Sequence, residues 1–228
     1  MDISNALNSL KEGVDEWNKW RRRDGTGEVT LTGVDLSETD LASVDLSGVN
    51  APGADLYRSD LSSANLKMSN FEGADFSNAR LEAAGGYKVS FKGAYLVEAN
   101  LEDADLAEAD LRAADLRGSN LRNVNLQGAL LTGARLDNAD LSGASLIDAD
   151  VSGVNFSFAK FDNTNLTGMR YGGYKLMQGL YYGVRGLDSS FGNALFVRDA
   201  KDQDYLDTME VMINRLPTGH LKSTELML

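Results

Sequence analysis

The side chains that could do chemistry fall mainly in a column of Asp and Asn that returns at every fifth residue. Its first members are Asp35, Asp40, Asp45, Asn50, Asp55, Asp60, Asn65, Asn70 and Asp75. A calcium loop needs ligands two residues apart and a terminal Glu, which this spacing does not provide. Asp and Asn also hydrogen-bond to their own local backbone and favour turns. The column therefore favours turn formation over metal binding, and we expect no metal and no cofactor.

Groups for nucleophilic or phosphate chemistry are missing from the sequence. It has no Cys, its one His is His220, and it contains no Gly-Lys-Ser/Thr phosphate-binding motif. No Ser–His–Asp or Cys–His arrangement can therefore be built within the repeats. Carboxylate pairs on a flat, solvated surface also lack the cleft that tunes catalytic acids and bases. We expect that the protein is not an enzyme.

The column belongs to a five-residue sequence repeat, here called the phrase, which consists of a small residue, an Asp or Asn, a Leu and two further residues. It runs without insertion or deletion over residues 29–167 of the 228-residue chain. Of the 28 positions taken at every fifth residue from 31 to 166, 25 are Leu or Phe, and the residue two places earlier is always Ala, Val, Ser or Thr. The exceptions are Ala51, Gly86 and Val151. This period fits neither an α-helix nor a β-strand. The Leu side chains must therefore point inward from a coil whose sides are about five residues long.

A second period sets the number of sides. Gly stands two places after the Leu position in steps of twenty residues, interrupted only by Ala113. These residues are Gly33, Gly53, Gly73, Gly93, Gly133, Gly153 and Gly173. Four pentads therefore make one turn, and we expect one corner of each turn to need the positive φ that Gly adopts readily.

The phrase is complete in Ala99-Asn100-Leu101 and Ala139-Asp140-Leu141. In it the sequence resembles the pentapeptide-repeat family, closely over residues 29–167 and weakly on to Arg198. The resemblance implies an all-β solenoid, a right-handed, four-sided β-helix of about seven to eight coils that lie roughly 4.8 Å apart. The Leu and the small residue face the interior. The expected core residues include Leu36, Leu41, Leu61, Leu101, Leu106, Leu111, Leu116 and Leu121.

The two ends of the chain predict helices beside the rod. Residues 1–28 hold an amphipathic helix and a linker, and the apolar stripe of the helix is expected to cap the first coil. The capping residues are Leu10, Val14, Trp17 and Trp20. Arg21–Arg23 are interpreted as the helix end and linker, with a small anion or nucleic-acid patch as the alternative. We expect residues 29–198 to form the β-helix, with 169–198 as degenerate last coils, and residues 199–228 to form a C-terminal helix and tail.

Departures from the phrase are the candidate interaction positions. Gly86 replaces a core Leu beside the outward Tyr87, which predicts a bulge or contact site, or else a packing irregularity that Phe71 and Phe91 fill. The other candidates lie in the degenerate coils and the C-terminal helix: Tyr174, Tyr182, Tyr205, Met209 and Met212. The C-terminal helix serves equally well as a cap on the last coil or as the contact of a homodimer.

Charge leads to two functional hypotheses. The net charge of −12 disfavours direct binding to nucleic acid and is compatible with a basic protein partner. We expect a non-catalytic scaffold for protein–protein interaction, with a partner of unknown identity. The alternative is an acidic DNA-mimic rod that binds DNA gyrase or another type II topoisomerase and modulates quinolone sensitivity, which the resemblance to quinolone-resistance members of the family suggests. The side through Leu41 and Leu121 is the most acidic, with seven acidic and three basic residues.

Three features weaken the DNA-mimic hypothesis. Arg and Lys interrupt the acidic sides, the amino-terminal helix carries Trp, and the surface loops of many quinolone-resistance members are missing. The first twenty residues contain no apolar run, which predicts neither a signal peptide nor a membrane span. We therefore expect a cytoplasmic protein that does not bind a membrane.

Overall fold

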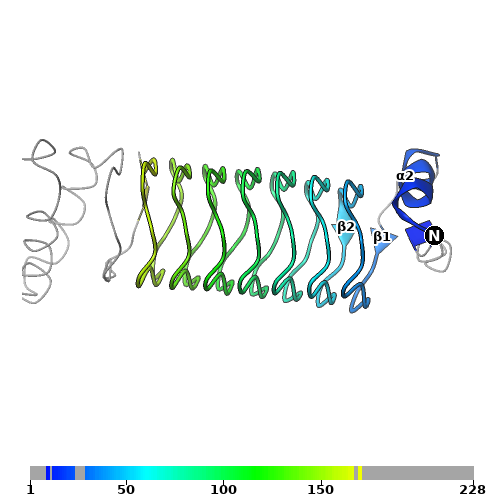
Figure 1. The fold of residues 1–228 in the computed structure, drawn as a ribbon, viewed down its shortest axis with the longest axis horizontal. Coiled ribbons are helices and arrows are strands. Elements are labelled where there is room, and N and C mark those ends of the chain that lie inside the picture. The colour runs from blue at the N-terminus through cyan, green and yellow to red at the C-terminus, as the bar shows by residue number, and fades with distance from the viewer. Residues whose placement is uncertain (1–8, 11, 24–28, 167–168, 171–228) are drawn as a thin grey trace, which may run out of the picture.

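The computed structural model describes residues 9–10, 12–23, 29–166 and 169–170. The coils stack along one axis into a rod, with the helix α2 (Val14–Arg23) at its amino-terminal end (Figure 1). The short strand β1 (Val29–Thr30) pairs in parallel with β2 (Val49–Asn50), so that Val29 lies opposite Val49. The first contact between coils therefore already has the twenty-residue offset that the sequence predicts.

The same offset continues along the whole rod. Every fifth residue from Asp35 to Asp150 forms a parallel bridge with the residue twenty positions later in the chain. One coil thus contains twenty residues on four sides, and residues 29–166 make about seven coils. The four-sided solenoid predicted from the sequence is the fold of these residues.

Backbone hydrogen bonds hold each side to the next coil. Leu61 shows the pattern: its N–H donates to the carbonyl of Arg80 at 2.7 Å, and its own carbonyl accepts from the N–H of Ala64 at 3.0 Å. The first bond joins two coils and the second closes the turn at the corner. The polar backbone groups of these inward-facing residues are therefore paired, as burial requires.

All four corners of a coil have the positive φ that the sequence predicts only for the Gly corner. From residue 33 to residue 163, every corner has a φ between 54° and 75°, and each turn resembles type II, in which the third residue has positive φ. Many of these corner residues are not Gly, and the left-handed conformation costs each of them roughly 1 kcal/mol. The expectation that the Gly corner is special was therefore wrong, because the other three corners adopt the same φ.

The core is a single column of apolar side chains inside the coils. Seven of the eight expected Leu residues are at most 1% exposed, and burial of each contributes roughly 1.5–3 kcal/mol. Leu36 of the first coil differs, being only partly buried, whereas α2 bonds to other sides of that coil, at Ser43, Asp45 and Ser47. Phe71 and Phe91 stack with their ring centroids 6.0 Å apart, and Phe76 meets both rings edge-on at 5.1 Å.

Candidate interaction surfaces

The helix α2 covers the first coil with the residues of its apolar stripe. Trp17 is fully buried, and its ring centroid lies 5.2 Å from that of Trp20. Leu10 is also buried, while Val14 and Trp20 pack against the core with part of their surface exposed. The four expected capping residues therefore lie together at the end of the rod.

Polar side chains of α2 take the place of the backbone of a preceding coil. Trp17 Nε1 donates to the carbonyl of Asp45 at 2.7 Å, and Asn18 Oδ1 accepts from the N–H of Asp45 at 2.8 Å. Arg21 donates to the carbonyl of Ser47. In the next coil, the N–H of Asn65 bonds instead to the carbonyl of Val44. Arg21 stands one turn after Trp17 and so lies on the docked face of the helix, although its charge predicted only a place at the helix end. Asn18 lies beside that face, outside the apolar stripe.

Basic side chains pair mostly with carboxylates one coil away. Examples are Arg80 with Asp60 at 2.9 Å and Lys92 with Glu72 at 2.8 Å. Arg112 and Arg117 pair instead with an Asp two residues earlier in their own coil. Among the basic residues described between 29 and 166, only Lys67 has no carboxylate partner. Because these pairs are largely exposed, each is worth only about 0.2–1 kcal/mol. Their main consequence is that the basic residues neutralise particular acids and leave the others to set the surface charge.

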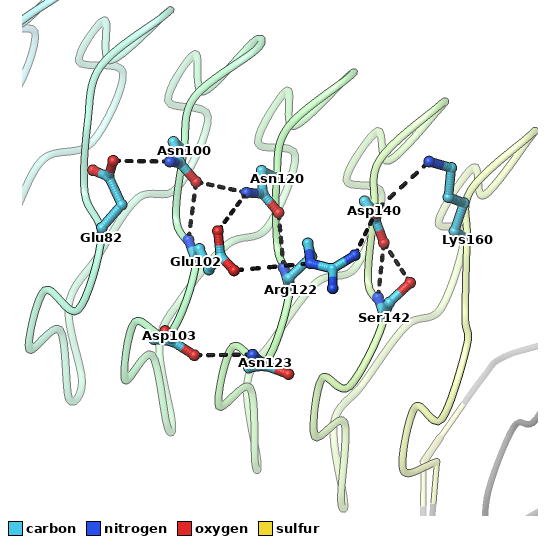
Figure 2. A network of polar contacts seen from close by, with 10 residues as sticks. All are labelled: Glu82, Asn100, Glu102, Asp103, Asn120, Arg122, Asn123, Asp140, Ser142 and Lys160. Atoms are coloured by element: carbon cyan, nitrogen blue, oxygen red, sulfur yellow. Dashed lines mark hydrogen bonds and ion pairs between the residues drawn. The ribbon is translucent and has the colours of Figure 1, made fainter.

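The side through Leu41 and Leu121 carries a continuous network, which we call the polar ladder (Figure 2). Its members are Glu82, Asn100, Glu102, Asn120, Arg122, Asp140, Ser142 and Lys160. Asn120 Nδ2 donates to Asn100 Oδ1 at 2.8 Å. The Arg122 guanidinium lies between Glu102 at 3.8 Å and Asp140 at 3.7 Å. Side chains of successive coils thus fix one another, and the basic residues expected to interrupt this acidic side are parts of its network.

Asp140 joins Arg122, Ser142 and Lys160 at one end of the ladder. Burial alone would raise the pKa of Asp140, but hydrogen bonds from Ser142 and the charges of Lys160 and Arg122 outweigh it and hold the pKa below its usual value. Asp140 therefore stays ionised through the neutral range. Its carboxylate is committed to three neighbours and is a poor candidate for acid–base chemistry.

A shallow polar depression lies beside the ladder. It is lined by Arg122, Asn123, Ser142, Gly143, Asp162 and Asn163. It forms because the small residues Ser142 and Gly143 stand between two coils with longer side chains at the same corner. Its open, polar lining suits the edge of a protein partner rather than an enclosed small-molecule ligand.

Three unpaired carboxylates occupy successive coils on the side through Leu36 and Leu116. Asp35, Asp55 and Asp75 are bridged in register, and none forms an ion pair with a described residue. Each accepts a hydrogen bond from the backbone N–H two residues later, at 3.0, 3.0 and 2.8 Å respectively. This is the local bonding predicted for the Asp/Asn column. Within the part of the chain that the structure describes, no three His, Cys, Asp or Glu residues are grouped to hold a metal ion.

The expected irregularity at Gly86 does not disturb the backbone. Gly85 keeps its bridges to Asn65 and Asp105, so the predicted bulge is wrong. A Cβ on Gly86 would lie 2.6 Å from Leu106 Cδ2 and 3.1 Å from Val89 Cγ1. Leu106 and Val89, rather than Phe71 and Phe91, therefore occupy the space beside Gly86.

Tyr87 is held against the surface by its neighbours. Its hydroxyl donates to Glu108 Oε1 at 3.2 Å, and Lys88 Nζ lies 5.1 Å from the centre of its ring. The other candidate interaction residues lie outside the described part of the chain: Tyr174, Tyr182, Tyr205, Met209 and Met212. A homodimer through the C-terminal helix therefore stays a prediction, as does the cytoplasmic location. None of the described helices combines the length and apolar character needed to cross a bilayer.

Comparisons with known proteins agree with this architecture. The family model for pentapeptide repeats matches with eight copies, over residues 28–62, 39–78, 87–123, 119–157 and 129–168. No curated protein matches the chain.

Several solved structures share the fold at low sequence identity. Two trypsin-treated variants of QnrB1, a plasmid-mediated fluoroquinolone resistance protein, are 22% and 21% identical with TM-scores of 0.53 and 0.51. Those alignments cover 69% and 74% of this chain and 81% and 95% of the QnrB1 chains. HetL from Nostoc sp. strain PCC 7120, a pentapeptide repeat protein involved in heterocyst differentiation regulation, is 32% identical over 67% of this chain and 84% of its own, with a TM-score of 0.30. At the identity of the QnrB1 variants, the likeness concerns the fold alone.

Proposed function

The chain belongs to the pentapeptide repeat family, and on that premise we propose that it is a non-catalytic, rigid scaffold that presents a side of its rod to a protein partner. The observation that carries this proposal is the unbroken twenty-residue register from Asp35 to Arg170. It places outward side chains at fixed spacings over several coils. Solenoids use extended surfaces of this kind for binding.

The polar ladder supports the proposal in energetic terms. Its side chains are already held by contacts such as Asn100 to Glu82 at 2.9 Å and Lys160 to Asp140 at 3.6 Å. A surface that is ordered before binding loses less conformational entropy when a partner docks. The sequence adds that His220 is the sole His and that Cys is lacking, which leaves few groups for catalysis.

Affinity capture followed by interface mapping tests the scaffold function. The full chain is used to capture proteins from the cells that produce it, and amide hydrogen exchange is then measured on the complex. We expect a captured protein to slow exchange along one side of the rod over several coils. Failure to capture any protein specifically, or protection scattered over all four sides, would contradict the proposal.

A second candidate function is DNA mimicry toward DNA gyrase. The run of Asp35, Asp55 and Asp75 favours it, because these carboxylates repeat in successive coils without an ion pair to a described residue. The fold similarity to QnrB1 is compatible with this function, whereas the ion-paired basic residues, which include Arg58 and Arg117 on the same side, weaken it. The test is gyrase supercoiling, with and without a quinolone, at micromolar protein. An unchanged reaction in both conditions rules this function out.

A further inference from the structure

Met68 is an exposed apolar residue at a corner of the rod. It is 65% exposed, and it occupies a corner at which φ is 56°. Among the described non-Gly residues with positive φ, only Met68 and Phe158 are large and apolar. Met68 thus carries the backbone cost of a corner without the benefit of burial. A partner that covered Met68 would bury an apolar side chain that the rod leaves exposed.

Gly85 lies in the next coil and is not required by the fold. Its φ is outside the positive range of the corners. A Cβ added to Gly85 would meet only Lys67 Cε at 3.8 Å and the Ala64 carbonyl at 4.0 Å, both ordinary contact distances. A larger residue would therefore fit. Gly at this position leaves a gap in a column that otherwise carries side chains, and the Lys67 side chain lies beside that gap.

Lys67 and Tyr87 border this gap. Lys67 is exposed and has no carboxylate partner among the described residues, whereas Lys88 is paired with Glu108 at 3.3 Å. The N–H of Met68 bonds to the carbonyl of Tyr87 at 2.9 Å, so the two residues lie side by side in adjacent coils. One side of the rod thus carries four groups close together. They are the unpaired cation of Lys67, the exposed thioether of Met68, the aromatic ring of Tyr87 and the backbone of Gly85.

We propose that Lys67, Met68, Gly85 and Tyr87, here called the Met68 patch, dock an extended segment of a partner protein in which an aromatic or large aliphatic residue stands beside Asp or Glu. The apolar side chain would lie over Met68 and the Tyr87 ring, with the gap at Gly85 allowing close approach. The carboxylate would pair with Lys67, whose charge no described residue neutralises. This assignment rests on the scaffold function proposed above and gives it a partner chemistry.

Selection of displayed random dodecapeptides on the immobilised full-length protein tests the assignment. Enriched peptides are then measured by fluorescence polarisation against Lys67→Glu, Met68→Ser and Gly85→Asn. The matched controls are Lys92→Glu, which makes the same charge change on another side, and Phe158→Ser, which removes an equally exposed apolar residue from another corner. Circular dichroism checks that each variant is folded.

We expect enriched peptides that combine an aromatic or large aliphatic residue with an acid. Binding should weaken about tenfold in each patch variant and less than about twofold in the controls, as for the central residues of an interface. The assignment is overturned if no peptide is enriched, if the enriched peptides are basic, or if Lys67→Glu binds them unchanged. Peptides that instead lose affinity on Arg122→Ala would overturn the Met68 patch while leaving the scaffold function standing.

Discussion

The side through Leu41 and the side through Leu46 are built from the same phrase, yet they present different surfaces. On the first, side chains of the polar ladder bond from coil to coil between Glu82 and Lys160 (Figure 2). On the second, the column runs from Asn65 through Gly85 to Asp105 with its backbone bridges intact but without a side chain in the middle. Because the backbone register is the same, the difference lies in the side chains. The inward positions specify the coil, and the outward positions specify each surface independently.

The largest effects are expected from changes to the packing around Gly86, first among them the restoration of the missing Leu. In Gly86→Leu, the new side chain would enter space that Leu106 and Val89 already fill, since even a Cβ would lie 2.6 Å from Leu106 Cδ2. Overpacking of this kind typically costs about 1–3 kcal/mol. We therefore expect the residue that completes the phrase to lower the free energy of unfolding, measured by urea denaturation.

The matched control for this substitution removes the obstacle. Leu106→Ala alone should be destabilised by about 2–5 kcal/mol, as is usual when a buried Leu is truncated. Combined with Gly86→Leu, it should lose less than the sum of the two single changes, because the new Leu fills part of the cavity. Strict additivity, or a Gly86→Leu variant as stable as the wild type, would show that Leu106 does not fill this space.

The next largest effect is expected from acid, which should weaken the polar ladder. The folded pKa of Asp140 lies below its unfolded value near 3.9, so this carboxylate contributes stability that is present above that pH and is lost as the pH falls through the folded pKa. Hydrogen bonds from Arg112 and Arg117 likewise lower the pKa of Asp110 and Asp115. We therefore expect the melting temperature to decrease as the pH is lowered below about 4.

Variants of the ladder show how much of this loss belongs to Asp140. Asp140→Asn should melt lower at neutral pH but lose less on acidification. Ser142→Ala, which removes a hydrogen bond to the same carboxylate, should show a smaller change in the same direction. An identical pH dependence in the wild type and Asp140→Asn would mean that this carboxylate contributes no pH-dependent stability.

The outcome of sequence-based prediction divides along the same line between coil and surface. The register, the number of sides and the buried Leu residues could be predicted, because packing inside a narrow coil allows few residue types at the inward positions. The conformation of the corners could not, since residues as different as Glu38, Lys88 and Phe158 all adopt positive φ there. Nothing in the sequence showed that Leu106 fills the space beside Gly86, which depends on side-chain packing.

The ion pairs were missed although the sequence contains their signal. Arg80 follows Asp60 by twenty residues and Lys92 follows Glu72 by the same interval, so residues of opposite charge one coil apart can be read from the twenty-residue period. Asn18 of α2 carries no such signal. Its pairing with the first coil depends on where the helix docks, and the repeat does not specify that.

A smaller effect is expected from the cation in the middle of the ladder. Arg122→Ala removes two long, half-exposed ion pairs, and we expect a loss of about 0.5–1 kcal/mol that shrinks in high salt. Lys67→Ala is the matched control on the other side, because Lys67 has no described carboxylate to lose. Urea denaturation at two salt concentrations measures both. Equal losses in the two variants would mean that the ladder adds nothing to stability through its charges.

The smallest effect is expected when two adjacent glycines, Gly85 and Gly86, are each replaced by Ala. Gly85→Ala should raise the free energy of unfolding by about 0.5 kcal/mol, because its φ suits any residue, its Cβ meets nothing closer than 3.8 Å, and Ala loses less backbone entropy on folding. Gly86→Ala makes the same chemical change one residue later and should lower stability, since its Cβ meets Leu106. Opposite signs in urea denaturation would show that packing requires Gly86 alone, so that Gly85 is free to serve the surface. A loss of stability in both variants would instead make Gly85 part of the coil and remove one of the reasons for placing a docking site beside Met68.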